Sequence, residues 1–257
     1  MDEFPPPRRL PGEPPLPADA EVHDELDESP LRRPPHHRED DGPPAVVDES
    51  VDTFGAEAAA ADLAERIQRI QPGAVRVAED GRALLSPPFD GTRDRVGEPT
   101  AGRPILVVFG AYGTPWSPSL GSVLAQVRER QPTAVAVAWR HYPDPAAHPH
   151  AVLLSLAAEA AAALGRFWAL SSELLRRRHT EPADLHAAML RAGVDPHRAL
   201  GLMEAGTGAD RIVDDVASAL ASGVTYSPAL FIDDERYQGD VDPVAVTAAL
   251  EAAGHEA

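Results

Sequence analysis

The side chains in this sequence that are best suited to bind a metal are its histidines. His148 and His150 stand two positions apart, and His141 precedes them by seven residues. A metal site also needs converging partners, and Asp144 is the only acidic residue beside these three histidines. A second pair, His36-His37, falls in a proline-rich stretch that would not preorganise a coordination geometry. We therefore expect no metal site and no bound cofactor.

The chain contains no cysteine. Thiol–disulfide exchange needs one thiolate as the attacking group and a second sulfur as the leaving group. A hydroxyl replaces neither of them, because its pKa is far higher than that of a thiol. The chain is therefore unable to exchange disulfides, and it has no disulfide framework and no cysteine–zinc site.

The charge of the chain argues against a nucleic-acid ligand. The net charge is −18, with 41 acidic against 23 basic residues, whereas a phosphate-binding surface is basic and releases counterions. The only compact basic cluster is Arg176-Arg177-Arg178-His179. We interpret this cluster as the C-terminus of a helix, where cations complement the helix dipole.

No segment of the sequence has the length and apolarity of a membrane span. The apolar run 152–164 is short and contains Ser155 and Glu159. The N-terminus is acidic where a signal peptide would be basic. The sequence therefore predicts a protein that does not span a membrane and that is cytoplasmic.

Composition divides the chain into a tail and a folded part. Residues 1–50 hold 12 of the 27 prolines and about half of the net negative charge. Such a stretch buries too little apolar surface to offset the entropy of ordering, so we expect it to be disordered. The remainder is rich in alanine and long enough to form a core.

Hydrophobic patterns in the remainder predict a central βαβ unit. Residues 105–109 and 134–139 are continuous apolar runs, typical of strands covered on both faces. Residues 119–130 between them have the apolar spacing of an amphipathic helix. A strand, a helix and a strand at this spacing form a right-handed βαβ unit.

The same patterns predict the elements on either side of this unit. Before it we expect a helix and a short hairpin, and after it a block of helices, a second hairpin and a last helix. These elements are a helix at 54–70; strands at 74–78 and 82–85; helices at 151–164, 167–177, 182–192, 196–204 and 210–222; strands at 229–232 and 236–238; and a helix at 243–253.

This order is that of a thioredoxin-like α/β fold with an inserted helical subdomain. The predicted organisation is a tail at 1–50, an extension of one helix and a hairpin at 51–92, and the α/β domain at 93–257. The helical insertion covers about 150–222.

Several segments carry a resemblance to a known family. Residues 109–117, Phe-Gly-Ala-Tyr-Gly-Thr-Pro-Trp-Ser, stand where that family has a strand, an aromatic residue and a Cys-Pro-aromatic-Cys motif. Residues 158–168 and 224–239 match two further motifs in the correct order. Over about 93–254 the sequence resembles the DsbA-like branch of the thioredoxin superfamily, in the form found alone or fused to bacterial sodium/proton antiporters.

The resemblance implies an active-site loop that has lost its chemistry. Thr114 and Ser117 take the positions of both cysteines, so no catalytic residue is expected. Pro115 and Trp116 keep the middle of the motif. Ser227-Pro228 matches the position of the family's cis-proline, so we predict a cis bond there and a binding groove made by these six residues, Thr114, Pro115, Trp116, Ser117, Ser227 and Pro228.

Three functions are compatible with this pattern. The first is a non-enzymatic binding or regulatory module that holds a peptide or protein in the groove, with Tyr112, Tyr142 and Tyr226 beside it. The second is a glutathione-binding enzyme similar to the kappa-class transferases, in which Thr114 or Ser117 would donate a hydrogen bond to the glutathione thiolate. The third is a degenerate scaffold that recruits partners through its tail.

Overall fold

The computed structural model describes residues 53–97, 100–131, 135–177 and 182–256. The predicted tail, 1–50, lies outside the described residues. Two apolar runs form the centre of the fold: β2 (Ile105–Gly110) and β3 (Ala136–His141) are buried at every position. They pair in parallel, with Ile105 opposite Ala136.

Three shorter strands complete the sheet. Its order is β1-β3-β2-β4-β5, and every pairing other than that of β2 with β3 is antiparallel. These strands are β1 (Arg95–Val96), β4 (Ala229–Ile232) and β5 (Glu235–Arg236). The central βαβ unit and the terminal hairpin are thus confirmed.

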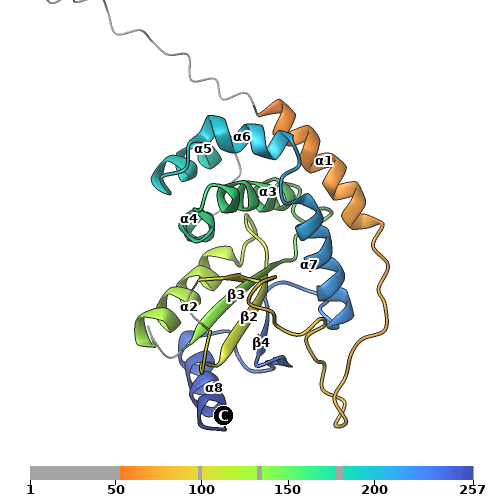
Figure 1. The fold of residues 1–257 in the computed structure, drawn as a ribbon, viewed down its shortest axis with the longest axis vertical. Helices are drawn as coiled ribbons and strands as arrows, with labels where there is room; N and C mark the ends of the chain where they lie inside the picture. Colours follow the sequence, from red (N-terminus) through yellow and green to blue (C-terminus); the bar gives the residue numbers. More distant parts are fainter. Residues whose placement is uncertain (1–52, 98–99, 132–134, 178–181, 257) are drawn as a thin grey trace, which may run out of the picture. The chain divides into compact units, whose positions relative to one another are not determined.

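Helices cover both faces of this sheet. Successive side chains of a strand point to opposite faces, so Leu106 and Val108 join one core while Val107 and Phe109 join the other. The first face packs against α2 (Ser117–Arg130) and α8 (Pro243–Glu256), and α7 (Ala209–Ala221) lies against the second, as Figure 1 shows.

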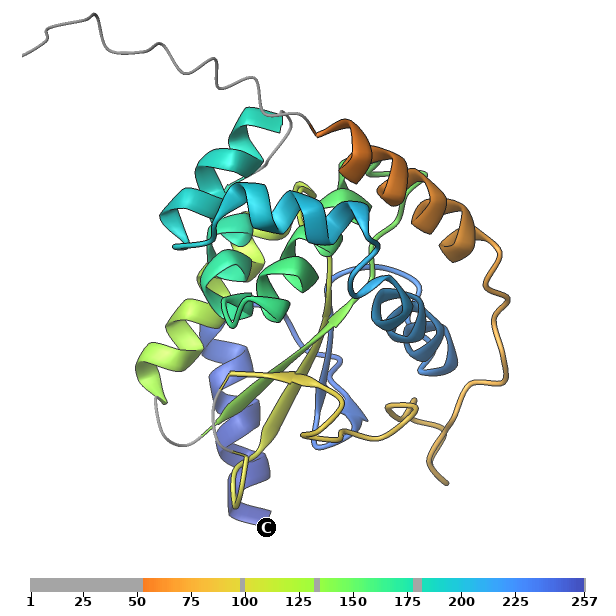
Figure 2. The same cartoon turned by 45° about the horizontal axis from the view of Figure 1, so that its top comes forward.

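The inserted helices gather beyond one end of the strands, as Figure 2 shows. At their centre is α3 (His150–Ala163), which is buried at all positions from Ala151 to Ala161. The other inserted helices pack around it and on one another: α4 (Phe167–Arg176), α5 (Pro182–Arg191) and α6 (Pro196–Glu204). None of the helices in the described parts of the chain has the length and apolarity to cross a membrane.

The N-terminal helix α1 (Phe54–Gln68) packs against α3, α6 and α7. Its buried side chains are Ala56, Ala60, Leu63 and Ile67, which repeat at the helical spacing of three and four residues. All four belong to the main hydrophobic core. The helix that was expected as an extension therefore shares its core with the inserted helices.

Three local predictions differ from the structure. The expected hairpin at 74–85 is shorter than predicted. Its arms are joined by the antiparallel bridge between Val77 and Ala83 and by two backbone hydrogen bonds, from Ala78 to Arg82 at 2.8 Å and from Leu84 to Arg76 at 2.9 Å. The two-residue strand β1 was not predicted, because it carries no periodic pattern and exists through its pairing with β3. The second central strand runs on to His141, two residues beyond the predicted end at Trp139.

Candidate functional site

The loop between β2 and α2 brings the two predicted hydroxyl residues together. The Oγ1 atom of Thr114 lies 3.0 Å from the Oγ atom of Ser117. The Ser117 hydroxyl donates to the carbonyl of Ala111 at 3.1 Å and accepts from the backbone N–H of Thr114 at 3.0 Å. Both side chains are buried.

The hydrogens of these two hydroxyls are already used inside the loop. A hydroxyl has one hydrogen to donate. Since the Ser117 hydrogen goes to Ala111, Thr114 is the donor in the contact between Thr114 and Ser117. With these contacts made, neither hydroxyl retains a hydrogen for a ligand.

The middle of the loop is open to solvent. Pro115 is exposed, and Trp116 is 61% exposed at the start of α2. Large apolar side chains at such exposure are common at binding surfaces when they border a cavity. The peptide bond between Ser227 and Pro228 is cis, as predicted.

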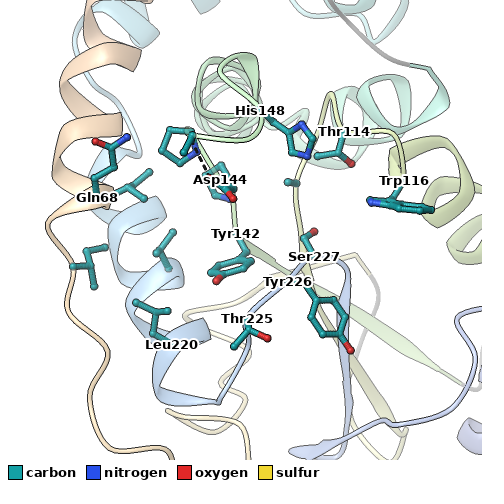
Figure 3. Close-up of a pocket in the computed structure, with 17 residues that line it drawn as sticks. Gln68, Thr114, Trp116, Tyr142, Asp144, His148, Leu220, Thr225, Tyr226 and Ser227 are labelled. Atoms are coloured by element: carbon teal, nitrogen blue, oxygen red, sulfur yellow. Dashed lines mark hydrogen bonds between the residues drawn. The ribbon is translucent and has the colours of Figure 1, made fainter.

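A cavity of about 440 Å³ opens between this loop and the cis-proline segment, as Figure 3 shows. That volume is typical of a ligand pocket. We call this cavity the groove. Its lining comes from the end of α1, the loops after β2 and β3, helix α7 and the segment before β4; the side chains used below are Ile67, Gln68, Ile70, Thr114, Trp116, Tyr142, Asp144, His148, Val216, Leu220, Thr225, Tyr226 and Ser227.

Only three of the six predicted groove residues line the groove. Thr114, Trp116 and Ser227 line the groove. The lining does not include Pro115, Ser117 or Pro228. Ser117 nevertheless holds Thr114 in place, because its hydroxyl accepts a hydrogen bond from the backbone N–H of Thr114. The groove residues on α1 and α7 were missed, because their neighbourhood depends on long-range helix packing that no local pattern signals.

The backbone of the segment before β4 is available for pairing. Among the described residues, no hydrogen bond joins the backbone N–H or C=O of Tyr226 or Ser227 to another group. An extended peptide uses such groups when it adds to the edge of a sheet. This segment is therefore suited to hold a ligand in an extended conformation.

The aromatic residues near the loop have different roles. Tyr112 belongs to the core: it is fully buried, it stacks on Trp139 with ring centroids 4.9 Å apart, and its hydroxyl contacts Ser171 at 2.9 Å. Burial raises the pKa of Tyr112. Tyr142 is half-buried in the groove, and Tyr226 is 64% exposed beside it.

His141, which was considered as a metal ligand, is a buried strand residue with a structural role. Its Nδ1 accepts from the indole N–H of Trp139 at 3.3 Å, so its Nε2 carries the hydrogen and donates to Glu159 at 3.1 Å. Arg95 is the second partner of Glu159. Burial opposes the ionisation of Glu159, but the hydrogen bonds from His141 and Arg95 outweigh burial and lower its pKa to about 2.

A second buried ion pair lies on the opposite face of the same strand. The guanidinium of Arg140 donates to both carboxylate oxygens of Asp94, at 2.7 and 2.8 Å. It also donates to Ser218 and to the carbonyls of Pro87 and Pro88. Arg140 and His141 therefore fit a strand interior because each one meets a partner from a distant part of the chain.

The remaining histidines do not converge on a cation site. His148 lines the groove, and His150 begins α3 at the surface. Across the described ranges, no group of three or more His, Asp or Glu side chains is arranged to hold a metal ion.

Comparison with solved structures identifies the fold. The oxidised form of BdbD from Bacillus subtilis superposes with a TM-score of 0.59 at 14% identity, covering 68% of this chain and 100% of BdbD. A thioredoxin-like oxidoreductase from Silicibacter pomeroyi has a TM-score of 0.57 at 20% identity, covering 64% of this chain and 94% of the other. The chain therefore has the thioredoxin-like fold of these proteins, and it contains no cysteine.

Sequence comparison leads to a narrower set of relatives. The Na⁺/H⁺ antiporter NhaA 3 of Salinispora tropica is 33% identical over 176 residues, which are 67% of this chain and 26% of the antiporter. NhaA 1 of Mycolicibacterium gilvum is 32% identical over 177 residues, 67% of this chain and 28% of the antiporter. The chain thus spans about a quarter of the length of these curated relatives. No protein-family model matches the sequence.

Proposed function

We propose that this chain is a redox-inactive binding module that holds an extended peptide or protein segment in the groove. The observation that carries the proposal is the position of the groove. It opens between Trp116 of the former redox loop and Ser227 of the cis-proline segment. The chemistry of the loop is lost, while a cavity of ligand size remains beside it.

The ligand would make two kinds of contact. Its backbone would pair with the free N–H and C=O groups of Tyr226 and Ser227, as in strand addition. Its side chains would pack on the exposed rings of Trp116 and Tyr226, since aromatic residues supply much of the binding energy at protein interfaces. This pairing favours an extended segment over a folded helix.

A peptide-display selection on the purified chain tests this function. We expect the wild type to enrich a set of random peptides that Trp116→Ala and Ser227→Arg fail to retain. Leu190→Ala is the matched control, because Leu190 is 57% exposed on α5, away from the groove, and its loss should leave the enrichment unchanged. Equal enrichment by all four proteins would refute a role for the groove.

The geometry does not favour the glutathione-binding alternative. That function needs a hydroxyl hydrogen directed at the glutathione sulfur, and the hydrogens of Thr114 and Ser117 are engaged within the loop. Calorimetry with millimolar glutathione should register no binding heat. A saturable heat that disappears in Thr114→Val would reinstate this alternative.

We also propose that the chain acts in the cytoplasm. Disulfide formation takes place outside the cytoplasm, and a chain without cysteine cannot take part in it. Fractionation of cells that express the tagged chain tests this location. Recovery with periplasmic or membrane markers would contradict it.

A further inference from the structure

The groove has a second end that the DsbA-like resemblance does not account for. Trp116 and Ser227, which lie within that resemblance, border one end. The other end is formed by Ile67 and Ile70, from α1 and the turn after it, together with Leu220 of α7, as Figure 3 illustrates for Leu220 and the end of α1. Residues 67 and 70 precede the segment 93–254 that carries the resemblance, so the part of this wall contributed by α1 and its turn is an addition to that segment.

Apart from the exposed Gln68 at the end of α1, the side chains at this second end are apolar and fixed in place. Ile67 is buried in the main core, and Val216 of α7 is buried beside the groove. The backbone N–H of Ile70 donates to the carbonyl of Ile67 at 3.1 Å, which holds the turn after α1 against the cavity. Ile70 and Leu220 are only partly buried, so each retains apolar surface that a ligand would cover.

A single carboxylate accompanies this apolar surface. Apart from His148, which is ionisable, Asp144 is the only charged side chain among the described residues that line the groove. Its Oδ1 atom accepts from the backbone N–H groups of Ala146 and Ala147, at 3.0 and 3.1 Å. No described residue donates to its Oδ2 atom, and Asp144 is an exposed residue.

These features define the charge of the ligand. A carboxylate oxygen at the rim of an apolar cavity attracts an ammonium or guanidinium group and repels an acid. The net charge of −18 on the chain acts in the same direction over longer distances. An acidic segment would therefore meet an unfavourable field both at the groove and during its approach.

We infer that the groove selects an extended peptide that has an aliphatic side chain next to a lysine or arginine. The aliphatic side chain would enter the apolar end formed by Ile67, Ile70 and Leu220, and the cation would pair with Asp144. This specificity rests on the proposed function, since it concerns which segment the same groove accepts.

The test uses a positional-scanning library of acetylated, amidated octapeptides on the full chain, followed by fluorescence polarisation with individual labelled peptides. Ile70→Ser removes apolar surface from the second end. Asp144→Asn removes the charge but keeps the oxygen that accepts from Ala146 and Ala147. Asp62→Asn on the exposed side of α1 is the matched charge control, and Leu190→Ser is the matched apolar control.

The inference predicts two separable changes. Ile70→Ser should weaken binding of peptides with leucine or isoleucine by about tenfold and leave the preference for a cation intact. Asp144→Asn should weaken binding of lysine and arginine peptides by about two- to fivefold, with a smaller effect at high salt. Both control variants should match the wild type.

Two other outcomes have distinct meanings. If the wild type retains peptides and Trp116→Ala releases them, but neither Ile70→Ser nor Asp144→Asn alters the preference, this specificity is wrong while the proposed function stands. If the wild type retains no more peptide than Trp116→Ala does, the proposed function itself fails, and the specificity fails with it.

Discussion

The hydroxyl oxygens of Thr114 and Ser117 lie 3.0 Å apart at the start of α2. The sequence resemblance aligns these two residues with the two cysteines of the DsbA-like family. This contact and the hydrogen bond from Ser117 to Ala111 hold the loop closed. It leaves Trp116, between the two residues, directed to solvent at the rim of the groove. The loop therefore combines two buried hydroxyls with an exposed aromatic ring beside the groove.

Replacing both hydroxyls by thiols should restore redox behaviour. In Thr114→Cys/Ser117→Cys the two sulfurs would stand close enough to bond, and the start of α2 would favour the thiolate form. We expect two maleimide-reactive thiols by mass spectrometry after reduction and none after treatment with oxidised glutathione. Since the wild type has no cysteine, any labelling belongs to the new pair. Two thiols that stay reactive after oxidation would show that the loop has lost the shape as well as the chemistry.

Glu159 should make stability depend on pH in the acid range. Its pKa falls from 4.5 to about 2 on folding, so its stabilisation is complete above about pH 4.5 and is lost as the pH falls through 2. At pH 7 Glu159→Gln should lower the free energy of unfolding by about 3 kcal/mol. Urea unfolding at several pH values should show the difference between wild type and variant shrinking from pH 5 to pH 2. A difference that does not vary with pH would contradict the assigned ion pairing.

Substitution of Tyr112 should lower the stability of the fold, whereas substitution of Trp116 should affect peptide binding alone. Tyr112→Ala empties a buried position that stacks on Trp139 and should cost about 3–5 kcal/mol of unfolding free energy. Trp116→Ala removes an exposed ring and should change stability by less than about 0.5 kcal/mol while it abolishes peptide retention. Urea unfolding measures both variants. A large loss of stability in Trp116→Ala would place its ring in the core and remove it from the binding surface.

The pair of Arg140 and Asp94 should show strong coupling. Arg140→Met leaves a buried carboxylate without its partner and should cost about 3–5 kcal/mol. The double variant Arg140→Met/Asp94→Leu removes both charges and should regain part of that loss. A double-mutant cycle from urea unfolding measures the coupling. Purely additive losses would contradict a direct interaction in the folded protein.

The sequence was sufficient for the central architecture. Continuous apolar runs identify the parallel strands, because both faces of these strands are covered, and the cis bond before Pro228 followed from the family resemblance. The predicted strand ends at Trp139, two residues too early, because Arg140 and His141 are polar residues typical of a surface. Only the folded structure shows that Asp94 and Glu159 pair with them inside the protein. A carboxylate such as Glu159 inside an alanine-rich helix was the one local sign of that buried pairing.

The candidate site was predictable only in part. The motif placed Thr114, Trp116 and Ser227, which line the groove. The wall that includes Ile67 and Leu220 depends on the packing of α1 against α7, and no spacing within either helix signals which helix the other will meet. The breadth of the groove, and with it the proposed specificity, therefore emerges from tertiary structure.

The central claim is that the former redox loop now binds through its groove, and acrylamide quenching of tryptophan fluorescence tests it most directly. Trp139 is fully buried, Trp168 is partly buried, and Trp116 is 61% exposed, so Trp116 should dominate the quenching. Saturation with a peptide selected on the wild type should lower the quenching constant, and Trp116→Phe should remove the change. Bound peptide that leaves the quenching of Trp116 unaltered would contradict the claim.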